Sequence, residues 1–276
     1  QGGNPRRVAW DKTEHEYPTV SERTHSHSLG SILKTKGMVT DQQITEALEK
    51  RLADEKLGQS LLRLKMLDLD SLGQALAEQA NCTYERIEPF NIPESTINLV
   101  PKQIALKYRV LPIRQESEQL ILTGENRLSP VALASIERQL DQKIQYQLCQ
   151  LGACTLGIRF HYLGDKNCNP TDKINQKVDS GSISESIRQA LLDEYFSSQV
   201  LFGDALQQAG LIEPAVFNQI IMGFDYSSNQ RLGDYLVEHD LISEHVLQKV
   251  ITLQKSRQRS IDSLMSQYEI TQGDKK

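Results

Sequence analysis

The chain has 276 residues, a length typical of about two domains, with a formal net charge of -5 and 24% charged residues. The acidic balance argues against a general nucleic-acid-binding surface. No apolar run approaches the roughly 18 to 20 residues that a membrane-spanning helix needs. Because the chain begins with Gln1 and has no signal-peptide pattern, we expect it to be a piece of a longer protein.

Residues 1–27 are predicted to form an irregular arm, since prolines and polar clusters interrupt any periodicity. Trp10, the single tryptophan, is expected to dock elsewhere on the molecule, because its large side chain gains stability on burial. No carboxylate or cysteine cluster completes a metal site with the histidines of this arm, so none is predicted. These histidines are His15, His25 and His27.

The cysteines form no C-x-x-C pair and have no histidine at metal-ligand spacing. We therefore expect reduced, structural cysteines. They are Cys82, Cys149, Cys154 and Cys168.

A 24-residue pattern occurs four times, at residues 28–51, 56–79, 201–224 and 231–254. Each copy has a glycine at its third position, a turn near its tenth and apolar residues spaced along one later helical face. Each copy is therefore predicted to form a short helix, a tight turn and a longer helix.

The conformations within a copy follow from the residue types. The third-position glycine removes a Cβ where another backbone, or a ligand, must come close. Gly37 suits the left-handed conformation at the turn, which Lys65 and Asp240 are expected to adopt at equivalent positions. Thr40 and Asp68 are good N-caps for the second helices.

The segment between the two pairs of copies is predicted to be a compact α/β sandwich. Turn signals, prolines and alternating apolar residues divide it into elements. These are a helix from Pro93 to Tyr108, strands at 110–113 and 119–123 joined by the turn 115–118, a helix from Ser129 to Leu140, a strand at 144–148 and a helix at 151–162.

The expected fold class is mainly α with a small α/β sandwich, in which two helical repeat pairs flank a three-stranded module. The segment after the sandwich is polar and is predicted to be a linker. Ser184 is expected to cap a helix carrying Ile187, Leu191, Leu192 and Tyr195. The predicted domains are the arm 1–27, the first pair 28–82, the α/β module 83–163, the linker 164–183, the second pair 184–256 and a flexible tail 257–276.

The first two copies and the sandwich resemble the MshEN domain, found at the N-terminus of type II secretion and pilus-assembly ATPases. That family carries two R-L-G-type units followed by an I-P, V-P and V-L-P-I signature. The signature stands here as Ile92-Pro93, Val100-Pro101 and Val110 to Ile113. The resemblance covers 28–163, with a second pair at 201–254 that no sandwich follows.

The resemblance implies binding of cyclic di-GMP and no catalysis by this segment. The G-x-x-x-x-G-K-[ST] motif of ATPases is absent from the sequence, and no nucleophile–base set can be argued. In the family, an arginine and a glutamine of each unit contact guanine, the Leu-Gly turn offers backbone N–H groups, and leucines pack on the bases. The residues so assigned are Ser28, Leu29, Gly30, Ile44, Leu48, Arg51, Lys56, Leu57, Gly58, Leu72, Leu76, Gln79, Arg231, Leu232, Gly233, Leu247 and Gln254, with Asn126, beside Glu125, at the family's acidic position.

The copies depart from the family pattern unevenly. Copy one has Ser28 and Arg51 at the arginine and glutamine positions, and copy two has Lys56 and Gln79. Copy four keeps both residues, whereas copy three keeps neither. We favour the first pair as the ligand site, because the sandwich that follows can complete its pocket.

The arm, around Trp10-Asp11-Lys12-Thr13, resembles the segment that follows the membrane-embedded region of some family-two glycosyltransferases. This resemblance implies a cytoplasmic sensor domain at the inner membrane. It would control an attached glycosyltransferase that makes an exopolysaccharide used as a phage receptor. The implied partners are that membrane region and an outer-membrane phage-receptor protein. The alternative is a protein-docking module of the same complex that binds no nucleotide.

Overall fold

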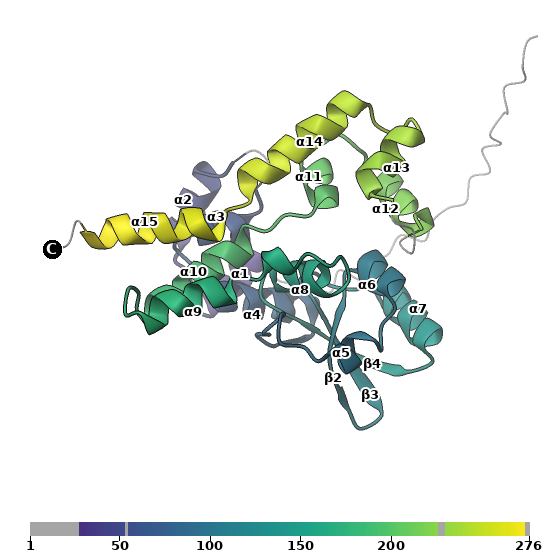
Figure 1. Ribbon diagram of the computed structural model, residues 1–276, viewed down its shortest axis with the longest axis horizontal. Coiled ribbons are helices and arrows are strands. Elements are labelled where there is room, and N and C mark those ends of the chain that lie inside the picture. Colours follow the sequence, from purple (N-terminus) through teal and green to yellow (C-terminus); the bar gives the residue numbers. More distant parts are fainter. Residues whose placement is uncertain (1–27, 53–54, 226–229, 274–276) are drawn as a thin grey trace, which may run out of the picture.

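The computed structural model describes residues 28–52, 55–225 and 230–273 (Figure 1). The arm, with Trp10 and its three histidines, lies outside these ranges. Within them, no helix has the length and apolar character needed to cross a membrane.

All four copies form the predicted helix–turn–helix unit. The N-caps Thr40 and Asp68 accept hydrogen bonds from the backbone N–H groups of Gln43 at 3.2 Å and Ser71 at 2.8 Å. Lys65 adopts a φ of 56° at the turn of copy two, as predicted. The first pair consists of α1 (Leu29–Thr35), α2 (Asp41–Glu49), α3 (Leu57–Arg63) and α4 (Leu69–Ala80), and the second of α11 (Phe202–Gln208), α12 (Pro214–Gly223), α13 (Leu232–Glu238) and α14 (Glu244–Arg257).

The module between the pairs is built on a four-stranded sheet with the order β1-β4-β3-β2. The strands β2 and β3 are antiparallel, while β4 runs parallel to β3 and to β1. The prediction of three strands was therefore wrong, because it missed the short β1. The strands are β1 (Thr83–Tyr84), β2 (Leu111–Glu116), β3 (Gln119–Gly124) and β4 (Lys143–Leu148), and the helices are α5 (Glu94–Ile97), α6 (Lys102–Tyr108), α7 (Pro130–Leu140) and α8 (Ala153–His161).

Two local predictions in this module need correction. The single helix expected up to Tyr108 is split into α5 and α6, because the residue before Pro101 is disfavoured in the helical conformation. The turn between β2 and β3 is tighter than the predicted 115–118, since the strands pair as far as Glu116 and Gln119.

The segment predicted to be a linker is largely structured and packs in part against the core. It contains a 3-10 turn, η1 (Lys166–Cys168), and α9 (Thr171–Asp179). Ile174 is fully buried and Cys168 is 2% exposed. Ser184 caps α10 (Glu185–Ser197), as predicted.

The predicted flexible tail also contains a packed helix, α15 (Ile261–Gly273). Its Leu264 is fully buried in the main hydrophobic core. Helices α9 and α15 both contact α10, so the three form a bundle beside the first pair (Figure 1).

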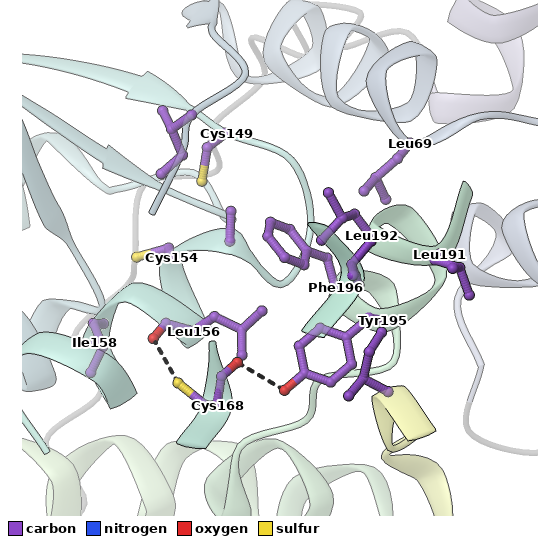
Figure 2. Close-up of a cluster of buried hydrophobic side chains, with 14 of the residues drawn as sticks. Leu69, Cys149, Cys154, Leu156, Ile158, Cys168, Leu191, Leu192, Tyr195 and Phe196 are labelled. Carbon is purple, nitrogen blue, oxygen red and sulfur yellow. Dashed lines mark hydrogen bonds between the residues drawn. The ribbon is translucent and has the colours of Figure 1, made fainter. Parts of the chain in front are cut away.

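This core contains residues from segments that the sequence analysis assigns to separate domains. Figure 2 shows Leu69 of α4 and Phe196 of α10 in the same cluster as Cys154 and Leu156 of α8. The hydroxyl of Tyr195 in α10 donates a hydrogen bond to the backbone carbonyl of Cys168, at 2.9 Å. The α/β module, the first pair and the α9–α10–α15 bundle therefore share one core.

Copies one and two differ where they meet this core. In copy two, positions 7 and 14 are Leu62 and Leu69, which pack in the main core. In copy one, the same positions hold Lys34 and Asp41, which form a surface ion pair at 2.5 Å. The first pair therefore docks through copy two.

Candidate functional site

The third-position glycines contact the second helix of their own copy. A Cβ added to Gly58 would lie 2.6 Å from Leu72 Cδ1, and one added to Gly233 would lie 2.6 Å from Leu247 Cδ1. At Gly30, the nearest atom would be Leu57 Cδ2, at an ordinary 3.5 Å. Close helix packing therefore explains why glycine is needed at positions 58 and 233, but it does not explain the glycine at position 30.

The two copies of the first pair pack reciprocally. Helix α1 contacts α4, and α2 contacts α3. The alanines at position 20, Ala47 and Ala75, are fully buried between them. Helices α2 and α4 therefore bury one face between the copies, and the residues beside that face are accessible to solvent or to a ligand.

The apolar residues assigned to the ligand separate into two groups. Leu72 and Leu247 are 3% and 5% exposed and belong to the cores of their pairs. By contrast, Leu48 is 48% exposed, and Leu52, which the sequence reasoning missed, is 61% exposed. The remaining assigned apolar side chains are half-buried, and they are Leu29, Ile44, Leu57, Leu76 and Leu232.

Apart from Lys65, which lies over the ring of Tyr268 at 6.0 Å from its centroid, the cations of the first pair divide into two groups. Four have a carboxylate partner within 2.8 Å, and they are Lys34, Lys36, Lys50 and Arg63. Arg51 and Lys56 are exposed, and neither has a carboxylate partner among the residues that the structure describes. These two cations stand at either end of the connection between copies one and two, and Leu48 and Leu52 lie within about one helical turn of Arg51 in the sequence.

The other polar residues assigned to the first pair occupy defined positions. Ser28 caps α1, with its hydroxyl oxygen accepting from the N–H of Ser31 at 3.2 Å. Lys56 holds the same N-cap position before α3, where its own N–H donates to Gln59 Oε1 at 2.9 Å. Gln79 is half-buried near the end of α4.

In the second pair, several equivalent positions are engaged in contacts within the protein. The side-chain amide of Gln254 donates to the backbone carbonyl of Val200 at 2.7 Å. Phe224, which replaces the glutamine in copy three, is buried against Tyr235 with ring centroids 5.0 Å apart. Arg231 is exposed at the N-cap of α13. The assigned glutamine of this pair is therefore used to hold the chain that enters copy three.

Sandwich residues form a separate polar corner after β3. Glu125 accepts a hydrogen bond from the backbone N–H of Thr155 at 2.7 Å, at the start of α8. Burial raises the pKa of Glu125, and the nearby Arg109 opposes that rise. Asn126, the residue aligned with the family's acidic position, is exposed. Both line a cavity of about 80 Å³ with Arg109 and Cys154.

Arg109 connects this corner to the second pair. Its guanidinium makes two hydrogen bonds to the carboxylate of Asp204 in α11, at 2.5 and 2.9 Å. Because α11 belongs to copy three, the α/β module that follows the first pair also contacts the second pair. Bidentate pairs of this kind fix orientation as well as distance.

Comparison with known proteins identifies the class of domain. Residues 80–163 match the MshEN domain, so the chain carries an MshEN domain. The match begins at the end of α4 and covers the whole α/β module.

Over most of its length, the chain is homologous to a bacteriophage adsorption protein. It is 35% identical over 266 residues to bacteriophage adsorption protein B of Escherichia coli (strain K12), covering 96% of this chain and 36% of that protein. Bacteriophage N4 adsorption protein B of Escherichia coli O157:H7 matches with the same figures. The chain thus spans about a third of the length of these relatives.

More distant matches cover smaller parts. The type IV pilus assembly ATPase PilB of Myxococcus xanthus (strain DK1622) is 26% identical over 98 residues, covering 35% of this chain and 17% of PilB. A solved structure of MshE with cdg aligns at 22% identity and a TM-score of 0.40, covering 49% of this chain and 99% of that one.

Proposed function

We propose that the first repeat pair binds cyclic di-GMP and thereby controls a glycosyltransferase region attached to this chain. The single observation that carries the proposal is the cluster of Leu48, Arg51, Leu52 and Lys56. It combines exposed leucines with two cations that have no carboxylate partner among the described residues. The presence of an MshEN domain directly after this pair supports the assignment.

The chemistry of the cluster suits a cyclic dinucleotide. Such a ligand has two phosphates, which need positive charge, and two purines, which offer flat apolar faces. Exposed leucines can pack on a purine, and the planar guanidinium of Arg51 can stack on one or hydrogen-bond its edge. Lys56 supplies a compact charge for a phosphate, although it cannot stack as an arginine does.

The second pair is the weaker candidate on the same grounds. Gln254 is committed to Val200, and Phe224 fills the equivalent position in copy three. Arg231 remains as one exposed cation at the start of α13. We therefore infer that the chain binds ligand at the first pair.

Control of the attached enzyme requires the ligand to distinguish two states of the protein. The homologous adsorption proteins are longer than this chain, which leaves room for the catalytic region outside it. In our proposal, that region is an inner-membrane glycosyltransferase whose exopolysaccharide serves as a phage receptor, and this chain lies on the cytoplasmic side. Polymer synthesis in membranes that does not respond to cyclic di-GMP would contradict this part of the proposal.

Calorimetry with cyclic di-GMP, GMP and GTP tests the ligand directly. We expect cyclic di-GMP to bind more tightly than either mononucleotide. No binding at about 100 μM, which corresponds to roughly −5.5 kcal/mol, would refute the sensor function. Arg51→Ala and Lys56→Ala should each weaken binding at least tenfold, whereas the matched exposed cation Arg231→Ala should leave it unchanged.

The alternative function is protein docking, and the exposure of Leu48 and Leu52 also favours it. The two functions differ in what the leucines should affect. If Leu48→Ser abolishes association with the membrane region while the unaltered chain binds no nucleotide, the docking function replaces the sensor function.

A further inference from the structure

Leu52 and Glu55, the described residues of the connection between copies one and two, take part in a dense hydrogen-bond network. Glu55 Oε1 accepts from Arg63 Nε at 2.8 Å, and its Oε2 accepts from Arg63 Nη2 and from the Ser60 hydroxyl, each at 2.8 Å. The backbone N–H of Leu52 donates to the same Oε2 at 3.2 Å. One carboxylate thus ties the start of the connection to α3.

Arg63 extends the network to the end of copy one. Its Nη2 also donates to the backbone carbonyl of Lys50, at 2.8 Å. Lys50 directly precedes Arg51, and Glu55 directly precedes Lys56. A single guanidinium therefore contacts the residue before Arg51 and the residue before Lys56.

The network is not an ordinary surface ion pair. The side chain of Glu55 is 12% exposed, and Ser60 is fully buried. Burial alone would raise the pKa of Glu55, but the hydrogen bonds from Arg63, Ser60 and Leu52 outweigh it and lower that pKa. The carboxylate is therefore held in its charged form.

The second pair has a contact between the equivalent positions with different chemistry. The residue before copy four is Gln230, and its amide donates to Glu238 Oε2 at 2.5 Å. Glu238 corresponds to Arg63 by its place in the repeat. In both pairs, the residue before the later copy is hydrogen-bonded to the last residue of that copy's first helix. In the first pair that last residue is Arg63, which also contacts Lys50 at the end of copy one.

From this arrangement we infer that Glu55 and Arg63 are positioning residues, which fix the separation and orientation of Arg51 and Lys56 and so set the affinity for an anionic ligand. This inference rests on the proposed function of the first pair. A fixed pair of cations binds more tightly than a freely moving one, because less conformational entropy is lost on binding.

The test compares Arg63→Ala with a matched ion-pair variant, Lys36→Ala, in the whole chain. Lys36 pairs with Glu78 at 2.7 Å, and neither residue belongs to the connection. We expect Arg63→Ala to weaken cyclic di-GMP binding at least tenfold and to speed hydrogen exchange at the Leu52 amide. Lys36→Ala should change neither quantity. Arg63→Lys keeps the positive charge but loses the several N–H groups of the guanidinium. Its affinity should therefore lie between those of Arg63→Ala and the unaltered chain.

Thermal unfolding separates positioning from general loss of structure. The inference holds if affinity falls while the melting temperature of Arg63→Ala stays close to that of Lys36→Ala. Unchanged affinity in Arg63→Ala overturns it, whatever happens to hydrogen exchange. Absence of binding by the unaltered chain overturns the proposed function instead, and the Leu52 exchange rate then shows whether Arg63 orders the connection at all.

Discussion

The repeat glycines provide a test in which one position serves as the control for another. Gly58 and Gly30 occupy the same place in copies two and one, so the helix-propensity gain of a Gly→Ala change is nearly the same at both. Their surroundings differ, because the new Cβ would lie 2.6 Å from buried Leu72 in one case and 3.5 Å from half-buried Leu57 in the other. The difference between the two variants therefore isolates the steric term.

The expected magnitude follows from this geometry. Overpacking of a buried leucine costs about 1–3 kcal/mol, and replacing a helical glycine by alanine gains up to about 1 kcal/mol. We expect the free energy of unfolding of Gly58→Ala to lie about 1–3 kcal/mol below that of Gly30→Ala, because the propensity gain is common to both. Gly30→Ala should leave the free energy of unfolding unchanged or raise it by up to about 1 kcal/mol.

Urea unfolding monitored by circular dichroism measures both values under the same conditions. If Gly58→Ala is as stable as Gly30→Ala, Leu72 has moved without cost and packing does not explain the glycine. Gly233→Ala should behave like Gly58→Ala, since its Cβ would meet Leu247 at the same 2.6 Å. A stable Gly30→Ala that no longer binds cyclic di-GMP would show that the ligand, rather than packing, requires this glycine.

Three further predictions follow from charge and burial. Because the pKa of Glu55 is lowered in the folded state, its contribution to stability is complete above its unfolded pKa of about 4.3 and is lost as pH falls through the folded pKa. The difference in unfolding free energy between the unaltered chain and Glu55→Gln should therefore be constant from neutral pH to about 5 and shrink below that; a constant difference down to pH 3 would contradict it. Burial raises the pKa of Cys149 to about 12, so Ellman's reagent at pH 8 should modify half-buried Cys82 well before Cys149, and the reverse order, read by mass spectrometry, would be inconsistent with the fold. Arg109→Ala should destabilise the chain by about 1–3 kcal/mol, since it leaves Asp204 without its partner, and equal stability in urea unfolding would show that this pair does not hold α11.

The repeats could be predicted from sequence because each copy carries its own local signals. Thr40 and Asp68 mark the starts of helices, and Gly37 marks a turn, so the units required no knowledge of distant residues. The same holds for α7, where Ser129 and Pro130 stand side by side.

The parts that could not be predicted depend on tertiary contacts. Strand β1 has two residues and exists because Thr83 and Tyr84 pair with the end of β4. Helix α9 is largely polar, and its fully buried Ile174 is visible as an anchor only once α10 is in place. In α15, Ile261 and Leu264 have helical spacing, but the polar residues around them make the segment resemble a flexible tail.

For the candidate site, the repeat pattern predicts positions but does not indicate which of them face solvent. Leu48 and Leu72 are both apolar residues of second helices, yet Leu48 is exposed whereas Leu72 is buried in the core of the pair, where it packs against Gly58. Leu52 lies outside the repeat and was missed for that reason. The use of Gln254 to hold Val200 could not be foreseen from its place in the motif.

Positions 7 and 14 are leucines in copy two, Leu62 and Leu69, but an ion pair in copy one, Lys34 and Asp41. This difference determines which face of the first pair can pack against other apolar surfaces. A duplicated unit with quasi-two-fold symmetry offers two equivalent faces, and two apolar faces would allow it to bridge successive molecules into a chain. Because one face carries an ion pair and the other a pair of leucines, the two faces are not equivalent, and the chain covers the apolar face with its own core. The difference at these four residues thus sets the orientation in which the first pair packs on the rest of the chain.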